Sequence, residues 1–360
     1  MRKIKVGVGL SGGVDSSVSA LLLKEKGYEV IGIFMKIFDE KDRRFVSSRK
    51  SACYAPEEKD IEDIEKVCKI LKIPFYIVDL RKEYKGIVLE YFKNEYLNGK
   101  TPNPCVICNR FLKFDILLKK AFSLGIEFDY FATGHYVRIF YDRERGRYIL
   151  KRGIDKEKDQ SYFLFLLTQE QLSKIIFPLG EYKKAEVREI AKKRDLPLFD
   201  KEESQDFISG DRFFFFDNFM KRGDIVDKNC NILGKHKGII YYTIGQRKGL
   251  GIAKGKPLYI IKIDANDNKI IVGEEKDLYK KVIIAEKTNF ISIPNLEKEI
   301  EVEAKIRYKH NPAKAKILPI GDDKVRVEFA KPQRAPTPGQ AVVFYNKDEV
   351  VGGGFIADVL

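Results

Sequence analysis

The feature that most constrains the fold is a loop rich in glycine and serine near the start of the chain. An apolar stretch at residues 3–10 leads into it, and a stretch of helical character at 16–26 follows. Glycines let backbone N–H groups approach phosphate oxygens, and the N-terminus of the following helix adds positive potential. Serine hydroxyls can donate to the same anion. The sequence therefore predicts a phosphate-binding loop, Gly9-Leu10-Ser11-Gly12-Gly13-Val14-Asp15-Ser16-Ser17.

Asp15 adds a charge constraint to this loop. A carboxylate beside a phosphate is repelled unless a cation lies between them, so we expect Mg²⁺ with the nucleotide. The lysine of the GxxxxGK[ST] motif is absent, which argues against a motor-type P-loop. The SGGxDS motif, which begins at Ser11, instead resembles that of the PP-loop ATP pyrophosphatases. That resemblance implies ATP as cofactor, cleaved between its α and β phosphates, with AMP attached to a carbonyl oxygen.

Strands and helices alternate in the first half of the chain. We expect strands at 3–10, 29–37, 75–80 and 130–133, and helices at 16–26, 60–72 and 111–124. This alternation favours an α/β domain, a parallel sheet with helices on both faces. Ligands of such sheets bind beyond the carboxyl ends of the strands.

The character of the chain changes near Gly210, where short alternating stretches separated by turn signals begin. These candidate strands are 238–244, 258–263, 269–273, 301–308, 324–329 and 341–345. We therefore predict three domains. They are a catalytic domain of PP-loop, HUP-like type at 1–205, a small central β-rich domain at 206–280 and a C-terminal antiparallel β-barrel at 281–360.

The chain is basic, with 67 Lys and Arg against 53 Asp and Glu and a net charge of +14. Such an excess favours a polyanionic partner through counterion release. A lysine-rich surface without such a partner is the alternative that charge alone leaves open.

Composition also bears on location. Five cysteines in 360 residues form no disulfide framework, which suits a reducing cytoplasm. The longest apolar stretch, 162–167, is far shorter than the ~20 residues of a membrane span. The apolar run at the N-terminus is short and is broken by polar residues, so it does not resemble the apolar segment of a signal peptide. We expect a cytoplasmic protein with no membrane partner.

Two of the cysteines, Cys105 and Cys108, form a CxxC preceded by prolines. Asn109 is a candidate cap of the following helix, which would put Cys108 near a helix N-terminus and lower its thiol pKa from about 8.5. Arg110 and Lys113 lie within one helical turn and favour the thiolate as well. A CxxC by itself fits a redox pair, half of a zinc site or cluster ligands, and no second CxxC or HxxxH completes a zinc set.

Further motifs follow in order along the chain. They are Asn103–Phe114, Ala132–Tyr136, Lys158–Phe163, Tyr242–Leu250, Lys305–Tyr308, Gln333–Ala341 and Gly352–Ile356. Together with the phosphate loop, they resemble the tRNA-specific 2-thiouridylases of the MnmA type over essentially the whole chain. Ordered motifs in three regions are more specific than any one of them alone.

The resemblance implies an enzyme that replaces the 2-oxygen of the wobble uridine of certain tRNAs with sulfur, using ATP and a persulfide relay. The partners it implies are tRNA and a sulfur donor, either a persulfide carrier or sulfide. Cys108 matches the nucleophilic cysteine of the family, and Asp15 and Cys105 complete the expected catalytic set. The residues it implies for ATP are Gly9, Leu10, Ser11, Gly12, Gly13, Val14, Asp15, Ser16, Met35 and Gly134.

The resemblance also implies residues that contact the target base or the tRNA. These are Asn103, Pro104, Cys105, His135, Lys158, Asp159, Gln160, Arg307, Tyr308 and Gln340. Read from the residues alone, His135 also fits a hydrogen-bonded histidine at a strand end, Arg307 a solvated strand face and Met35 plain core.

The chain departs from the family pattern at two points. Many members have Asp where Cys105 stands, and a second catalytic cysteine in the stretch that here reads Glu203-Ser-Gln-Asp-Phe-Ile-Ser-Gly210 without cysteine. Cys105 takes over the relay in one interpretation, since a CxxC can form a disulfide. In the other, which we favour, Cys53, Cys105 and Cys108 hold an iron–sulfur cluster of the [4Fe-4S] type with one iron open to sulfide.

Two other functions compete with thiolation. Another PP-loop ligase, such as an amidating synthetase acting on a small carboxylate, would need neither a CxxC beside the site nor a basic all-β extension. An RNA-binding module with a structural loop would not need an intact SGGVDSS.

Overall fold

The computed structural model describes residues 2–45, 52–201, 206–208, 216, 221–252, 255–321 and 323–360. The chain forms two compact units, which are described separately. Unit 1 comprises Met1–Val88, Cys105–Arg212 and Asp348–Val350. Unit 2 comprises Leu89–Pro104, Phe213–Lys347 and Val351–Leu360. Within the described residues, no helix is long and apolar enough to cross a membrane.

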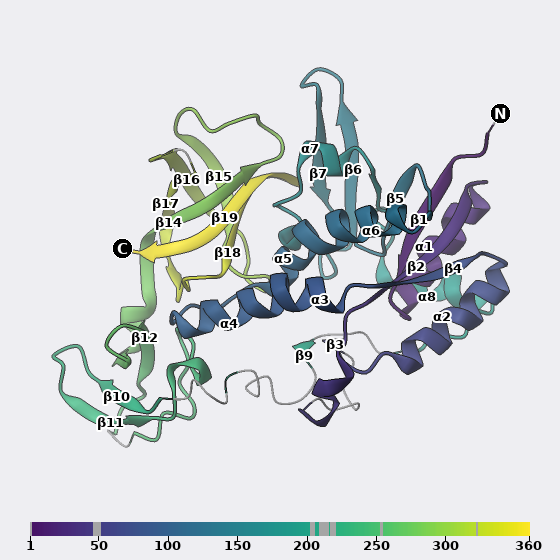
Figure 1. Ribbon diagram of the computed structural model, residues 1–360. Helices are drawn as coiled ribbons and strands as arrows, with labels where there is room; N and C mark the ends of the chain where they lie inside the picture. The colour runs from purple at the N-terminus through teal and green to yellow at the C-terminus, as the bar shows by residue number, and fades with distance from the viewer. Residues whose placement is uncertain are drawn as a thin grey trace. The chain divides into compact units, whose positions relative to one another are not determined.

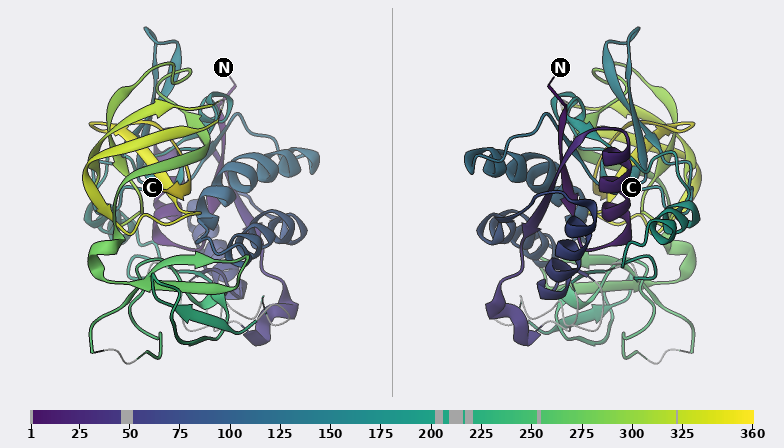
Figure 2. Two further views of the ribbon diagram at one scale, coloured as in Figure 1. Left: turned by 90° about the vertical axis from the view of Figure 1, so that its left-hand side faces the viewer. Right: turned by 90° about the vertical axis from the view of Figure 1, so that its right-hand side faces the viewer.

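A five-stranded parallel sheet forms the centre of unit 1 (Figures 1 and 2). Its strand order is β4-β2-β1-β5-β8, and every pairing is parallel. The strands are β1 Lys5–Leu10, β2 Glu29–Lys36, β4 Phe75–Asp79, β5 Tyr130–Ala132 and β8 Ile175–Ile176. The four strands predicted for this part of the chain are confirmed, and β8 was missed.

Helices cover both faces of the sheet, as the alternation predicted. They are α1 Val14–Glu25, α2 Glu58–Leu71, α3 Arg81–Tyr84, α5 Pro104–Ile107, η3 Cys108–Ile116, α6 Leu117–Ser123, α7 Gln169–Leu172 and α8 Lys184–Lys193. Val6, Val8 and Leu10 of β1 share one buried core with α1, α2 and α8. Gly7 and Gly9 face the other way, where a Cβ would touch the rings of Phe128 and Phe131.

Smaller elements of unit 1 surround the sheet. They are η1 Glu40–Phe45, β3 Ala52–Tyr54, β6 Val137–Asp142, β7 Arg147–Arg152, η4 Ser161–Phe163 and β9 Asp206–Ile208. Strands β6 and β7 form an antiparallel hairpin, and β3 pairs in parallel with β9. The chain leaves unit 1 within η2 (Lys85–Leu89).

Unit 2 begins with α4 (Glu90–Leu97) and contains a four-stranded sheet in the order β11-β10-β13-β12. Its strands are β10 Gly223–Val226, β11 Ile232–His236, β12 Tyr259–Asp264 and β13 Lys269–Gly273. The strand predicted at 238–244 is wrong. Gly238 has a φ of 146°, and a turn closed by the Tyr241 N–H on the Gly238 carbonyl forms the short helix η6 (Ile239–Tyr241) instead.

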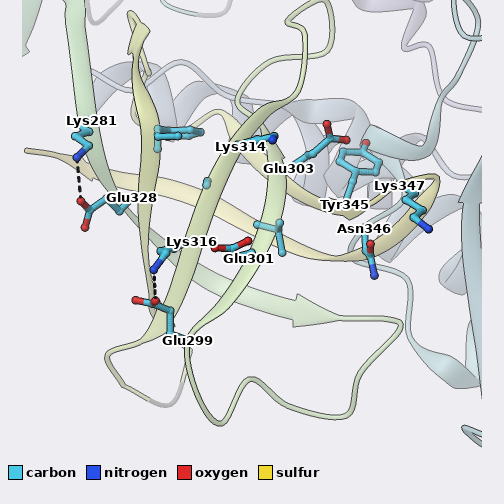
Figure 3. Close-up of a pocket in the computed structure, with 14 residues that line it drawn as sticks. Lys281, Glu299, Glu301, Glu303, Lys314, Lys316, Glu328, Tyr345, Asn346 and Lys347 are labelled. Atoms are coloured by element: carbon cyan, nitrogen blue, oxygen red, sulfur yellow. Dashed lines mark hydrogen bonds and ion pairs between the residues drawn. The ribbon is translucent and has the colours of Figure 1, made fainter.

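The last part of unit 2 is an antiparallel barrel. After η7 (Glu275–Leu278), its strands are β14 Tyr279–Phe290, β15 Ile300–Lys305, β16 Ala313–Pro319, β17 Val325–Arg334, β18 Ala341–Asn346 and β19 Glu349–Val359. Pairing of β14 with both β17 and β19 closes the barrel around an apolar core. A hollow on the barrel is lined in part by lysines and glutamates that form ion pairs, Lys281 with Glu328 at 3.3 Å and Lys316 with Glu299 at 2.9 Å (Figure 3).

The predicted fold class is therefore confirmed: a parallel sheet with helices, a small central β-rich part and a C-terminal barrel. The boundaries at 205/206 and 280/281 stay predictions. Residues 89–104, which the predicted first domain contained, group with unit 2.

Candidate nucleotide and thiol site

The predicted phosphate loop has the geometry of a cradle held by its own serines. The Ser16 and Ser17 hydroxyls donate to the Gly13 carbonyl at 3.1 and 2.9 Å, and the Ser11 N–H donates to Ser16 Oγ at 3.2 Å. Gly12 has a φ of 69°, and a Cβ there would lie 2.9 Å from Asp60 Cα. Only glycine fits this position, so the turn keeps its backbone open for a phosphate.

Lys201 links this loop to α2 through hydrogen bonds. Its ammonium donates to the Gly12 carbonyl at 2.8 Å, to Asp60 at 2.8 Å and to Asp63 at 2.7 Å. Hydrogen bonds to the two carboxylates outweigh desolvation and raise the pKa of Lys201. The sequence analysis missed this lysine, because nearly 190 residues separate it from Gly12 along the chain.

Asp15 is held by two groups that the sequence analysis did not assign to it. The Lys184 ammonium lies 2.7 and 2.8 Å from its two carboxylate oxygens, and the Tyr136 hydroxyl donates to Oδ1 at 2.7 Å. Lys184 is only 8% exposed. The repulsion that led us to expect Mg²⁺ beside Asp15 is thus already offset by a buried ammonium, and Mg²⁺ stays a prediction.

A single loop, Thr133–Tyr136, connects the phosphate cradle with the helix that carries Cys108; we call it the bridging loop. At one end, a Cβ on Gly134 would lie 2.9 Å from both Asp15 C and Ser16 N. At the other end, the His135 ring lies 5.9 Å from the ring of Phe114 in η3. The bridging loop therefore contacts both the phosphate cradle and η3, the helical segment that begins at Cys108.

His135 is a neutral, hydrogen-bonded histidine. Its Nδ1 is 2.6 Å from the Thr133 hydroxyl, and desolvation together with the nearby Lys113 holds its pKa well below the ordinary value. These contacts fit the alternative of a hydrogen-bonded histidine at a strand end. The contact of His135 with tRNA stays a prediction.

The predicted cap at Asn109 is wrong, because this residue lies inside the helix, whereas the CxxC occupies the first helical residues as expected. The helix begins at Pro104, whose fixed φ suits a first helical position, and continues through Cys105 into η3. From Cys108 the helix takes π geometry, and Gln171 Nε2 donates to the Arg110 and Phe114 carbonyls at 2.9 and 3.0 Å. A side chain from α7 thus satisfies backbone groups of the widened helix.

The thiol pKa values correct a second expectation. All five cysteines lie within the described residues and are free thiols; Cys105 and Cys108 are half-buried and Cys53 is exposed. Desolvation raises the pKa of Cys108 to about 11, although Lys113 opposes it as predicted. Desolvation, with the neighbouring Cys53 and Cys108 thiolates, raises the pKa of Cys105 to about 12. Burial therefore outweighs the cations, and both groups are thiols at neutral pH.

The iron–sulfur cluster expected on Cys53, Cys105 and Cys108 stays a prediction. Throughout the part of the chain that the structure describes, no group of three His, Cys, Asp or Glu side chains is placed to hold a metal ion. Cys53 and Cys108 are near enough to Cys105 to raise its pKa.

The expected second cysteine position falls largely outside the described residues. Of the stretch 203–210, only 206–208 is described, as strand β9.

Met35 lies half-buried in β2, opposite Val78 of β4. The two residues after this strand, Ile37 and Phe38, donate their N–H groups to the carboxylate of Glu57 at 2.8 and 3.1 Å. Glu57 is 7% exposed, and desolvation raises its pKa to about 7 against the lowering effect of these two hydrogen bonds. It fixes the backbone at the carboxyl end of β2, where a nucleotide is expected.

Three of the residues predicted to contact tRNA in unit 1 lie on one loop, namely Lys158, Asp159 and Gln160. Asp159 is buried and accepts from the Ser161 N–H at 3.1 Å and its hydroxyl at 3.0 Å, so its carboxylate shapes the loop. Gln160 accepts from the Tyr136 N–H at 3.0 Å. Lys158 is half-buried.

In unit 2, Gln340 positions the segment before the CxxC. Its Nε2 donates to the carbonyls of Thr101 and Pro102, both at 3.0 Å, directly ahead of Asn103 and Pro104. Arg307 donates to the Ala335 carbonyl at 2.6 Å and to the Thr337 hydroxyl at 2.5 Å. Its guanidinium is therefore bonded to other parts of the protein and is not merely a solvated side chain.

Tyr308 is half-buried near Arg307, and the Lys305 ammonium lies 5.4 Å from its ring centre. The tRNA contacts of both units remain predictions.

Comparison with known proteins identifies the family. Three family models match in succession: the tRNA methyl transferase HUP domain at 4–209, the tRNA methyl transferase PRC-barrel domain at 217–274 and the aminomethyltransferase β-barrel domain at 280–356. A tRNA-specific 2-thiouridylase MnmA 1 of Caldanaerobacter subterraneus subsp. tengcongensis is 52% identical, covering 98% of this chain and 97% of the relative. The chain belongs to the MnmA family.

Other MnmA relatives agree. The tRNA-specific 2-thiouridylase MnmA of Clostridium acetobutylicum is 49% identical, covering 98% of this chain and 99% of its own. That of Acetivibrio thermocellus is 48% identical, covering 99% and 100%. Among solved structures, a 4-thiouridine synthetase in complex with RNA and bound ATP covers 58% of this chain and 45% of that chain at 19% identity. Its TM-score of 0.34 is too low to support an argument.

Proposed function

We propose that this MnmA-family protein uses ATP to replace the 2-oxygen of the wobble uridine of tRNA with sulfur. The observation that supports this most is the bridging loop, which touches the phosphate cradle at Gly134 and the Cys108 helix at His135. A loop that contacts both elements supports a reaction between a group activated at the cradle and a sulfur carried by the helix of Cys108. The near-50% identity to proteins named 2-thiouridylases over almost the whole chain supports the same reaction.

The first step uses the cradle. The backbone of Gly9–Ser16 and the N-terminus of α1 hold the ATP phosphates, with Met35 and Gly134 at the edges of the site. The uridine C2 oxygen attacks the α-phosphorus and pyrophosphate leaves. Lys184 compensates the charge of Asp15 next to the phosphates, so the loop accepts an anion that Asp15 alone would repel.

The second step uses the two thiols. The outer sulfur of a persulfide on Cys108 attacks C2, and AMP leaves with the former uridine oxygen. The Cys105 thiolate then attacks Cys108 Sγ. That breaks the bond to the transferred sulfur, forms a Cys105–Cys108 disulfide and releases 2-thiouridine; a dithiol reductant restores the thiols. The pair is three residues apart in one helix, a spacing compatible with a disulfide.

The proposed partner is tRNA, whose target base is expected at Asn103–Cys105. Lys158, Gln160, Arg307 and Tyr308 are proposed further contacts, and a basic chain suits an RNA substrate. The base must leave its stack for this chemistry. The sulfur donor, a persulfide carrier or sulfide, and a cytoplasmic location stay predictions.

The amidating synthetase is not favoured, because it has no need for two half-buried thiols beside the nucleotide site. Incubation of the protein with a tRNA transcript, ATP, Mg²⁺ and glutathione persulfide for a single turnover, followed by mass spectrometry of the nucleosides, separates the two. We expect the parent to form 2-thiouridine and to release one AMP for each sulfur atom transferred to the tRNA. Cys108→Ser should form no 2-thiouridine. AMP release without RNA, and no thiouridine, would favour the synthetase.

A further inference from the structure

A third cysteine lies next to the proposed reacting pair, on a different element. Cys53 is the middle residue of β3, and its neighbour Tyr54 stacks on Tyr84 of α3 with ring centres 5.5 Å apart and planes 3° from parallel. Helix α3 in turn packs against η3, the segment that Cys108 begins. The packed elements β3, α3 and η3 thus connect Cys53 with Cys108.

The charges around these thiols agree with that packing. Lys113 lowers the pKa of Cys53, Cys105 and Cys108 alike, in each case against a larger effect of desolvation. Cys53 raises the pKa of Cys105 more than Cys108 does, and it also raises that of Cys108. Lys113 therefore acts electrostatically on all three thiols, and Cys53 acts on both members of the CxxC.

The three thiols differ in access. Cys53 is exposed to solvent, even though enough protein lies around it to disfavour its thiolate, whereas Cys105 and Cys108 are half-buried. A donor in solution meets Cys53 first. A half-buried thiol reacts with a bulky donor only after it is uncovered, but it can take sulfur from a neighbouring side chain.

We propose that Cys53 is the loading site at which a persulfide donor delivers sulfur, which is then handed to Cys108. This inference rests on the proposed thiolation. In the loading step, the Cys53 thiolate attacks the outer sulfur of the donor persulfide, and the donor thiol leaves. Cys108 then loses its proton to solvent and attacks the outer sulfur on Cys53. The Cys108–sulfur bond forms, the Cys53–sulfur bond breaks, and Cys53 leaves as a thiolate that takes up a proton. Neither transfer needs an oxidant or a reductant.

The test follows the sulfur on the unmodified protein. The protein is mixed with glutathione persulfide, quenched with an alkylating agent over a time course, and digested for mass spectrometry of the cysteine peptides. We expect persulfide on Cys53 before Cys108, and loading of Cys108 at least tenfold slower in Cys53→Ser. Cys230→Ser is the matched control, because Cys230 is also exposed but lies in unit 2. The unfolding midpoint of Cys53→Ser is compared with that of the parent.

Equal rates of Cys108 loading in the parent and Cys53→Ser would overturn the proposal, as would the appearance of persulfide on Cys108 first. A failure of thiolation itself is seen separately: Cys53 and Cys108 would then load in order, but no 2-thiouridine would form when tRNA and ATP are added.

Discussion

Lys184 and Asp15 form a partly buried ion pair across 169 residues of sequence, with the ammonium 2.7 Å from one carboxylate oxygen and 2.8 Å from the other. The pair joins the first turn of α8 to the first turn of α1, directly at the phosphate loop. A lysine in the first turn opposes the dipole of its own helix, so the pairing with Asp15 is what makes this position favourable. The cradle therefore contains its own cation.

Lys184→Met should weaken ATP binding. It leaves the Asp15 carboxylate beside the phosphates without its ammonium, and a lost hydrogen bond to a charged group costs about 1.5–3 kcal/mol. We expect KM for ATP to rise at least tenfold in tRNA-dependent ATP–pyrophosphate exchange. Lys183→Met is the control, since Lys183 is exposed on the same helix turn. Equal KM values for the two variants would contradict the role of Lys184.

Gly134→Ala should also impair the nucleotide site. A Cβ at this position would lie 2.9 Å from the backbone of Asp15 and Ser16, so the phosphate loop must shift. We expect at least a tenfold loss of ATP affinity by calorimetry. In Gly86→Ala, the added Cβ meets nothing within 4 Å, and that variant should bind like the parent. Unchanged affinity in Gly134→Ala would show that the loop does not need this close approach.

The reactivity of Cys108 should depend steeply on pH. With a thiol pKa of about 11, only the small thiolate fraction reacts, so alkylation by iodoacetamide should speed up about tenfold per unit between pH 7 and 10. Lys113→Met should slow it further at each pH, because Lys113 lowers the pKa. Lys119→Met is the control, because it also removes one positive charge, from an exposed lysine of α6, the helix after η3. A plateau of the rate below pH 8 would mean that the thiolate is stabilised after all.

Glu57 should make stability fall as pH rises. Its folded-state pKa of about 7 is above the ordinary 4.5, so the folded chain binds more protons than the unfolded chain between these values. The free energy of unfolding is therefore highest below pH 4.5 for this group and falls by roughly 3 kcal/mol by pH 7.

Glu57→Gln keeps an oxygen that can accept from the Ile37 and Phe38 N–H groups but cannot ionise. Urea unfolding from pH 5 to 8 should show a flatter profile for this variant and greater stability than the parent at pH 8. Parallel profiles of the two proteins would contradict the raised pKa of Glu57.

Binding of tRNA should weaken steeply with salt, because a net charge of +14 acts largely through counterion release. Filter binding from 50 to 200 mM KCl measures the slope. An affinity independent of salt would exclude the basic surface as the docking site.

The sequence by itself determined the parts of this protein that depend on local chemistry. The glycine and serine pattern at 9–17 specifies a cradle because Gly12 needs a positive φ, and the alternation of strands and helices specifies a parallel sheet. Motif order identified the family over the whole chain. Such features are local because steric limits and hydrophobic periodicity act over a few residues.

Only the tertiary structure decided the electrostatics of the site. Lys184 and Lys201 reach the cradle from distant segments, and Gln171 supports the π geometry at Cys108 from another helix. The thiol pKa values, expected to be low from neighbouring cations, are high because packing desolvates the sulfurs. Burial and long-range contacts depend on the whole fold, and they outweigh the charges that a sequence shows nearby.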